Sequence, residues 1–112
     1  MAIGAALMVL AGSEWGFSEQ PEIYIHFSAS DVSGASGCNR FAGRYEVNGT
    51  KLLIKQLAVT QMAYADDAVM REEQRFLGIL NETAEFEATH LRLVLKNKNA
   101  APLAVFKRRD WD

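Results

Sequence analysis

The sequence predicts an α+β fold in which a strongly bent antiparallel sheet, or partly open β-barrel, of about seven strands carries one helix packed on it. Several short segments alternate apolar and polar residues with the period of two that marks a half-buried strand. An Asn-Gly pair at 48–49 joins two such segments, as in a β-hairpin. Only one segment, after residue 66, has helical periodicity. One amphipathic helix cannot cover so many strands unless the sheet curls on itself.

The predicted strands follow one another with short connections. They cover residues 13–17, 22–28, 40–47 and 51–55, a short segment around Phe86, and residues 90–96 and 103–107. Their inward side chains are expected to include Ile23, Ile25, Phe27, Leu91, Leu93 and Leu95. Phe41 and Tyr45 are the bulky residues of the third strand, and Leu52 and Ile54 are in phase with each other in the fourth. The small residues of 33–39 predict a turn, and Gly43 permits a bend or a close approach. Asn48 and Gly49 both accept positive φ, which predicts a type I′ turn.

The helix is predicted to begin at Asp66 or Asp67, either of which can cap its first turn. Its apolar stripe consists of Val69, Phe76, Leu77 and Leu80, and Asn81 is the expected end. The adjacent carboxylates of Glu72 and Glu73 do not face each other on a helix, so we interpret them as helix-end and solubility residues.

Composition excludes several function classes. The chain has 112 residues, enough for one domain, and contains neither an internal repeat nor a linker. Twelve basic and 14 acidic residues give a net charge of −2, which provides no field for nucleic acid. One cysteine excludes an intrachain disulfide, and with two histidines it cannot form a structural zinc site unaided. We therefore expect no nucleic-acid partner, metal or cofactor.

The amino-terminal segment is apolar and uncharged as far as residue 12. It is too short for a stable membrane span, which needs about 20 residues. Its small residues at 10–12 resemble a signal cleavage region, although no basic residue precedes them. We interpret residues 1–11 as a leader or signal remnant and residues 12–112 as the domain. Residues 1–11 are also the candidate contact for a homo-oligomer.

Residues 32–45, VSGASGCNRFAGRY, resemble the G-x-x-G-C-N-x-F-x-G-x-Y signature of the META (HslJ-like) domain family. Residues 57–63 resemble the family's Leu-Ala-x-Thr-x-Met-Ala segment, and residues 73–77 its Glu-x-x-Phe-Leu helix opening. The candidate signature residues, for structure or partner contact, are Trp15, Gly34, Gly37, Cys38, Asn39, Arg40, Phe41, Gly43, Thr60 and Met62. Tyr64 stands where many members have a second cysteine, so a disulfide to Cys38 is impossible and Cys38 is a free thiol.

The resemblance implies a non-enzymatic cell-envelope protein, on the periplasmic side or secreted, with a cytoplasmic location as the alternative. Family members are mostly bacterial, often lipoproteins, and are linked to heat shock, stress and antibiotic tolerance. Their fold is similar to that of secretin pilot lipoproteins, which bind lipid. An envelope protein or an apolar ligand is therefore the expected partner.

Two other function classes remain open. One is a small thiol-dependent enzyme in which His26 or His90 activates Cys38. The other is a structural accessory domain of a larger assembly. Asn39 is expected to satisfy loop backbone groups, with ligand contact by Arg40 as the alternative. The basic residues 107–109 are offset by Asp110 and Asp112.

Overall fold

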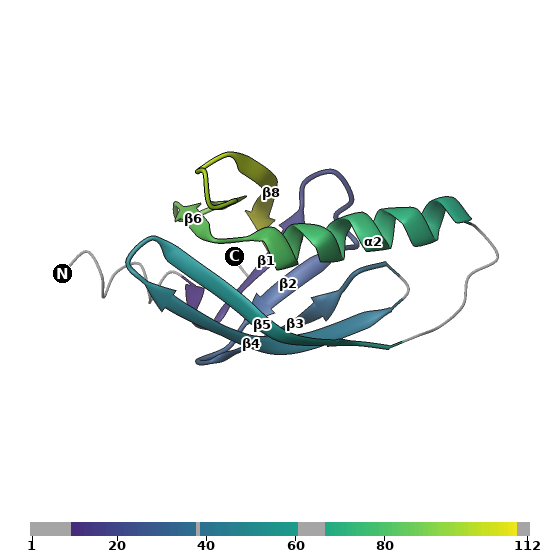
Figure 1. Ribbon diagram of the computed structural model, residues 1–112, viewed down its shortest axis with the longest axis horizontal. Helices are drawn as coiled ribbons and strands as arrows, with labels where there is room; N and C mark the ends of the chain where they lie inside the picture. Colours follow the sequence, from purple (N-terminus) through teal and green to yellow (C-terminus); the bar gives the residue numbers. More distant parts are fainter. Residues whose placement is uncertain (1–9, 38, 61–66, 110–112) are drawn as a thin grey trace.

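The computed structural model describes residues 10–37, 39–60 and 67–109, which form eight strands and one helix (Figure 1). The elements are β1 (Ser13–Phe17), β2 (Tyr24–Phe27), β3 (Asp31–Ala35), β4 (Arg40–Asn48), β5 (Lys51–Val59), α2 (Asp67–Glu82), β6 (Glu85–Ala88), β7 (Arg92–Lys96) and β8 (Pro102–Arg108).

The strands form a closed antiparallel barrel in which each pairs with its neighbours in the sequence. β1 pairs with β2 on one side and with β8 on the other, and this second pairing closes the sheet. The predicted barrel with one packed helix is therefore confirmed. It has one strand more than expected, and it is closed.

The additional strand is β3, most of which the sequence assigned to a turn. Val32 and Gly34 face inward from it, and both are buried. Its serine and glycine composition is typical of a turn, but pairing with β2 and β4 along the whole strand overrides that local preference.

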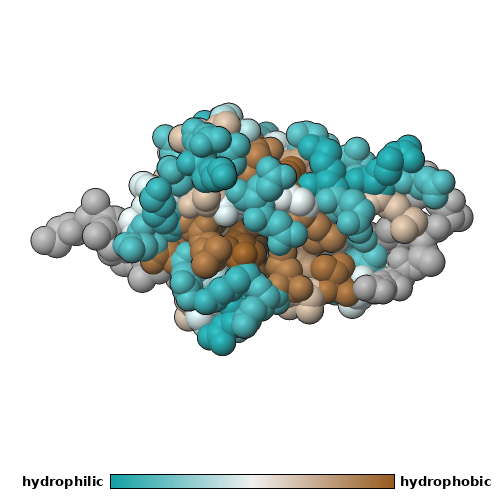
Figure 2. Space-filling model, viewed as in Figure 1, coloured by the Kyte–Doolittle hydropathy of each residue, from teal (hydrophilic) through white to brown (hydrophobic). Residues whose placement is uncertain are grey.

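The contact between β5 and β6 is much shorter than the other contacts between neighbouring strands. β5 has nine residues, yet only Lys51 pairs with a β6 residue, Glu85. Beyond this pair, α2 lies beside β5. Figure 2 shows apolar side chains gathered between α2 and the β4–β5 hairpin on this face of the molecule. The helix thus covers the part of the barrel that strand pairing leaves uncovered.

A β-bulge reverses the faces of β5 midway along the strand. Gln56 has a φ of 57°, and the β4–β5 register shifts opposite Gly43. Leu52 and Ile54 face the core before the bulge, whereas Leu57 and Val59 pack against it afterwards. The bend expected at Gly43 therefore lies on the partner strand, β5.

The β4–β5 hairpin is confirmed, but its predicted turn type is wrong. Asn48 remains in β4 and pairs with Lys51, so Gly49 and Thr50 are the two turn residues. Gly49 has a φ of 64°. Positive φ at the first central residue is the pattern of a type II′ turn, which also matches the twist of the strands.

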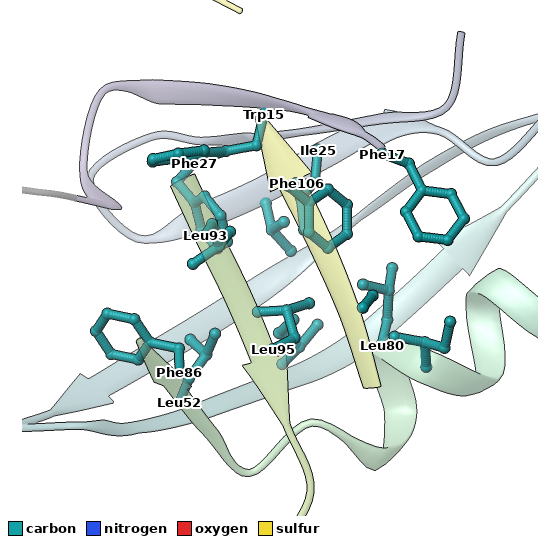
Figure 3. Packing of buried hydrophobic residues seen from close by; sticks show 14 of the residues in the cluster. Trp15, Phe17, Ile25, Phe27, Leu52, Leu80, Phe86, Leu93, Leu95 and Phe106 are labelled. Atoms are coloured by element: carbon teal, nitrogen blue, oxygen red, sulfur yellow. The ribbon is translucent and has the colours of Figure 1, made fainter. Parts of the chain in front are cut away.

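The barrel interior is filled by aliphatic and aromatic side chains (Figure 3). Phe76 from α2 inserts among Phe17, Phe41 and Phe106, with ring centroids 5.6, 6.0 and 6.2 Å from its own. Such tilted and edge-to-face arrangements are favourable beyond the area that they bury. Phe76, together with the buried Ile79 and Leu80, therefore holds the helix against the barrel.

Two predicted core positions are wrong. Leu91 precedes β7 and is 47% exposed, because the strand begins at Arg92 and the alternation has not yet started. Val69 is 37% exposed, since the first turns of α2 extend beyond the barrel (Figure 1). The helix also continues one residue past Asn81, to Glu82.

Replacing Ala100 with glycine is expected to raise the free energy of unfolding by about 0.5–1 kcal/mol, because Ala100 has a φ of 65°. Gly49→Ala is the matched opposite change, because Gly49 has a φ of 64° and nothing lies within 4 Å of an added Cβ. Alanine at this φ is strained, so this variant should have a lower free energy of unfolding. Urea unfolding of both variants checks the two signs. Equal shifts of the same sign would contradict this account.

Tyr45 makes stability sensitive to high pH. Its hydroxyl donates a hydrogen bond to the Ser28 carbonyl at 2.6 Å, and burial raises its pKa above 10.0. The unfolded chain therefore loses this proton at a lower pH than the folded chain does, so stability falls as pH rises above about 10. Tyr45→Phe should lower stability by about 1 kcal/mol at pH 7 but flatten the alkaline decline. Urea unfolding between about pH 7 and 11 measures both effects.

Candidate partner-binding groove

A buried carboxylate links α2 to the loop between β3 and β4. Glu73 Oε1 accepts a hydrogen bond from Ser36 Oγ at 3.0 Å, and Glu73 Oε2 accepts one from Asn39 Nδ2 at 2.8 Å. The Asn39 backbone N–H also donates to Glu73 Oε1, at 3.4 Å. All three residues are buried, with exposed fractions of 0%, 3% and 6% for Ser36, Asn39 and Glu73.

The network continues to Thr60, directly after β5. Thr60 Oγ1 donates to Asn39 Oδ1 at 2.9 Å and accepts a hydrogen bond from the Arg40 backbone N–H at 3.0 Å. One cluster thus brings together residues from three motifs: the glycine-rich signature, the Thr-containing segment and the motif that opens the helix. We call Ser36, Asn39, Thr60 and Glu73 the polar cluster.

The sequence interpretation of Glu73 as a solubility residue is wrong. Its carboxylate is buried and holds the loop, because α2 presents residue 73 to the barrel rather than to solvent. The Asn39 side chain bonds to Glu73 and Thr60. A signal was present, since residue 73 lies on the same helical stripe as 69, 76 and 80.

Two signature glycines allow close approach of neighbouring strands. A Cβ on Gly34 would lie 2.0 Å from the Tyr24 carbonyl oxygen and 2.9 Å from the Phe41 ring. A Cβ on Gly43 would lie 2.8 Å from the Lys55 carbonyl oxygen. Gly37 has a φ of 139°, and this conformation shapes the loop beside the polar cluster.

The other signature residues have separate positions. Trp15 is fully buried and donates from Nε1 to Ser13 Oγ at 2.7 Å. Phe41 is buried in the core, whereas the exposed Arg40 donates to the Tyr24 hydroxyl at 3.2 Å. Cys38 and Met62 lie outside the described residues.

The two histidines lie away from the core. His26 is on the outer face of β2, with Nδ1 3.5 Å from Glu14 Oε1, and His90 is exposed between β6 and β7. Among residues 10–37, 39–60 and 67–109, no three potential ligands form a metal site.

Arg108 and Arg109, two of the three carboxy-terminal basic residues, pack on aromatic rings. The Arg108 guanidinium lies 5.6 Å from the Trp15 ring centroid, and that of Arg109 lies 4.4 Å from the Tyr24 ring centroid. Arg109 Nε is also 3.6 Å from Glu14 Oε2. Within the described residues the acidic partner of Arg109 is thus Glu14 on β1, while Asp110 and Asp112 lie outside them.

A surface groove of about 390 Å³ lies between the first turns of α2, the connection from β1 to β2 and the loop between β3 and β4. It is open to solvent, and we call it the loop–helix groove. It is lined by Gln20, Glu22, Ile23, Ser36, Gly37, Ala68, Val69, Glu72 and Glu73. Its exposed apolar surface comes from Ala68 and Val69, with the buried Ile23 beneath them. Ser36 and Glu73 belong to both the groove and the polar cluster.

Two further grooves lie near the other end of α2. One, of about 290 Å³, includes Leu53 and Lys51, and the other, of about 360 Å³, lies between Glu82 and Asn97. Neither includes a residue of the candidate signature. In the described part of the chain, no helix is long and apolar enough to cross a membrane.

A closed eight-stranded antiparallel barrel with one helix packed on it, tied to the barrel by the polar cluster, defines a small single-helix barrel domain. The sequence matches the META domain over residues 6–110. The chain therefore belongs to the META domain family.

Solved structures share this fold. An NMR structure of a protein from Burkholderia xenovorans is 23% identical, with a TM-score of 0.74, and the match covers 96% of this chain and 88% of that one. A second NMR structure is 22% identical, with a TM-score of 0.68 and coverage of 90% and 92%. A crystal structure of a DUF4847 family protein from Bacteroides vulgatus is 13% identical, with a TM-score of 0.69 and coverage of 96% and 99%. No curated protein matches the sequence.

Proposed function

We propose that this META-domain protein is a non-enzymatic binding domain of the bacterial cell envelope, on the periplasmic side or secreted, with a role in stress or antibiotic tolerance. It recognises a protein partner or an apolar ligand in the loop–helix groove. The observation that carries this proposal is the construction of the groove: the apolar side chains of Ala68 and Val69 are open to solvent, while buried hydrogen bonds from Ser36 and Asn39 to Glu73 hold its walls.

The packing of the barrel favours the groove over the barrel interior as the binding site. The rings of Phe17, Phe76 and Phe106 are 5.4–6.2 Å apart and occupy the space beneath α2. Small eight-stranded barrels are either filled in this way or hold one small ligand. A ligand within the barrel would have to displace these rings, whereas the groove is accessible without rearrangement.

The test uses the matched variants Val69→Lys and Leu91→Lys. Both residues are exposed, at 37% and 47%, but only Val69 lines the groove. For an apolar ligand, an environment-sensitive fatty-acid probe should bind the parent chain and Leu91→Lys, and bind Val69→Lys more weakly.

For a protein partner, a photo-crosslinking residue at position 69, but not at position 91, should capture one specific envelope protein in intact cells. Absence of both signals, with the probe at up to about 1 mM, would refute the proposal.

A further inference from the structure

We infer that the loop–helix groove accepts a basic side chain flanked by apolar residues, presented by a segment of a partner protein. This inference rests on the proposed function and specifies the chemistry of the partner. It follows from three features of the groove: its charge, its apolar surface and its openness.

The charge of the groove is negative. Three of its lining side chains are carboxylates, and none of the lining residues described is basic. Glu73 is engaged by Ser36 and Asn39, but Glu22 forms no ion pair with any side chain that the structure describes. Glu22 therefore offers a carboxylate to an incoming cation.

Glu72 is only partly neutralised. Arg75 Nη2 lies 3.4 Å from Glu72 Oε1 and 2.8 Å from Glu19 Oε1, so two carboxylates share one guanidinium. The amino-terminal end of α2 contributes about half a positive charge. Asp67 in the first turn opposes that charge. The carboxylates thus outweigh the helix end, and the groove favours a cation.

The apolar surface of the groove and its openness to solvent indicate what surrounds the basic group in the partner. Ala68 and Val69 can contact the aliphatic stem of a lysine or arginine and its apolar neighbours, because these long side chains bury the stem while the charged end reaches a carboxylate. A free small ligand needs a site that encloses most of its surface. An open groove covers one side only, and so it suits a segment that the remainder of a partner protein holds in place.

The test compares two isosteric peptides on the isotope-labelled chain by NMR titration. The peptides are capped Leu-Arg-Leu and the same peptide with neutral citrulline in place of arginine. Both are used at up to about 10 mM, because one short segment binds weakly. We expect the arginine peptide to shift the amide signals of Gly37, Ala68 and Val69, with an affinity about fivefold higher than that of the citrulline peptide. At about 1 M salt, where the Debye length is about 3 Å, this difference should disappear.

The Glu22→Gln and Glu72→Gln double variant should remove the preference for arginine without unfolding the chain. Glu87→Gln, which changes an exposed carboxylate on β6 next to Lys96, is the matched control and should keep it.

The outcomes separate this inference from the proposed function. Equal binding of both peptides in the groove would overturn the inference and leave the proposed function standing. Shifts confined to another surface would overturn the inference. Octylamine binding in the groove without peptide binding would also overturn it, in favour of a free cationic amphiphile. No response of the groove to either peptide, together with a negative fatty-acid and crosslinking test, would refute both.

Discussion

Replacing Gly34 with alanine is expected to prevent folding of the barrel, or to lower its free energy of unfolding by more than about 3 kcal/mol. The added Cβ would lie 2.0 Å from the Tyr24 carbonyl oxygen, which is backbone of the adjacent strand and cannot rotate away. β2 and β3 would have to separate, and their separation would break the register that places Ile25 opposite Gly34. Circular dichroism and urea unfolding measure the effect.

Gly78→Ala is the control for this substitution. Gly78 lies in α2 with nothing within 4 Å of an added Cβ. The same change should therefore raise stability there by about 0.5–1 kcal/mol, since alanine favours the helix. If Gly34→Ala had the stability of the parent chain, close strand approach would not explain the glycine at this signature position.

Replacing Glu73 with alanine is expected to lower the free energy of unfolding by about 3–4 kcal/mol. Ser36 and Asn39 would lose the carboxylate that accepts their buried hydrogen bonds, and each unsatisfied buried donor costs about 1–3 kcal/mol. The region around the polar cluster should lose more stability than the rest of the barrel. Amide hydrogen exchange around residues 36–40 should therefore accelerate more than exchange in β7.

Glu72→Ala is the matched control, since Glu72 is the adjacent residue and its ion pair with Arg75 is at the surface. A surface pair of this kind contributes at most about 1 kcal/mol. Glu73→Gln keeps one acceptor oxygen and should fall between the parent chain and Glu73→Ala. Equal effects of Glu72→Ala and Glu73→Ala in urea unfolding would show that the polar cluster does not stabilise the fold.

The regular parts of the fold could be predicted from the sequence because they depend on local patterns. The alternation of Ile23, Ile25 and Phe27 fixed the inward face of β2, and the stripe of Phe76 and Leu80 fixed the buried face of α2. β3 could not be predicted in this way, since its strand conformation comes from its neighbours and not from its own residues.

The candidate site was predictable only in part. The signature residues pointed to the loop between β3 and β4 and the strands beside it. The role of Glu73, however, depends on contact with Asn39 and Ser36, which precede it by 34 and 37 positions in the sequence. The loop–helix groove combines three segments separated by tens of residues, and no local pattern in the sequence brings them together. The position of the Glu73 carboxylate on the apolar stripe of α2 was the one indication of the site that the sequence contained.

The short contact between β5 and β6 has a mechanical consequence. Under a pulling force across that contact, one residue pair bears the load, whereas the β1–β8 contact has three pairs and the others have more. The barrel should therefore open there first, into a flat eight-stranded ribbon that runs from β6 through β8 and β1 to β5. Because α2 connects β5 to β6 in the chain, this opening would pull Phe76 out of the barrel while the other ladders stay intact. The direction of an applied force thus decides whether the molecule yields at the two backbone hydrogen bonds that flank Lys51 and Glu85 or resists through whole ladders.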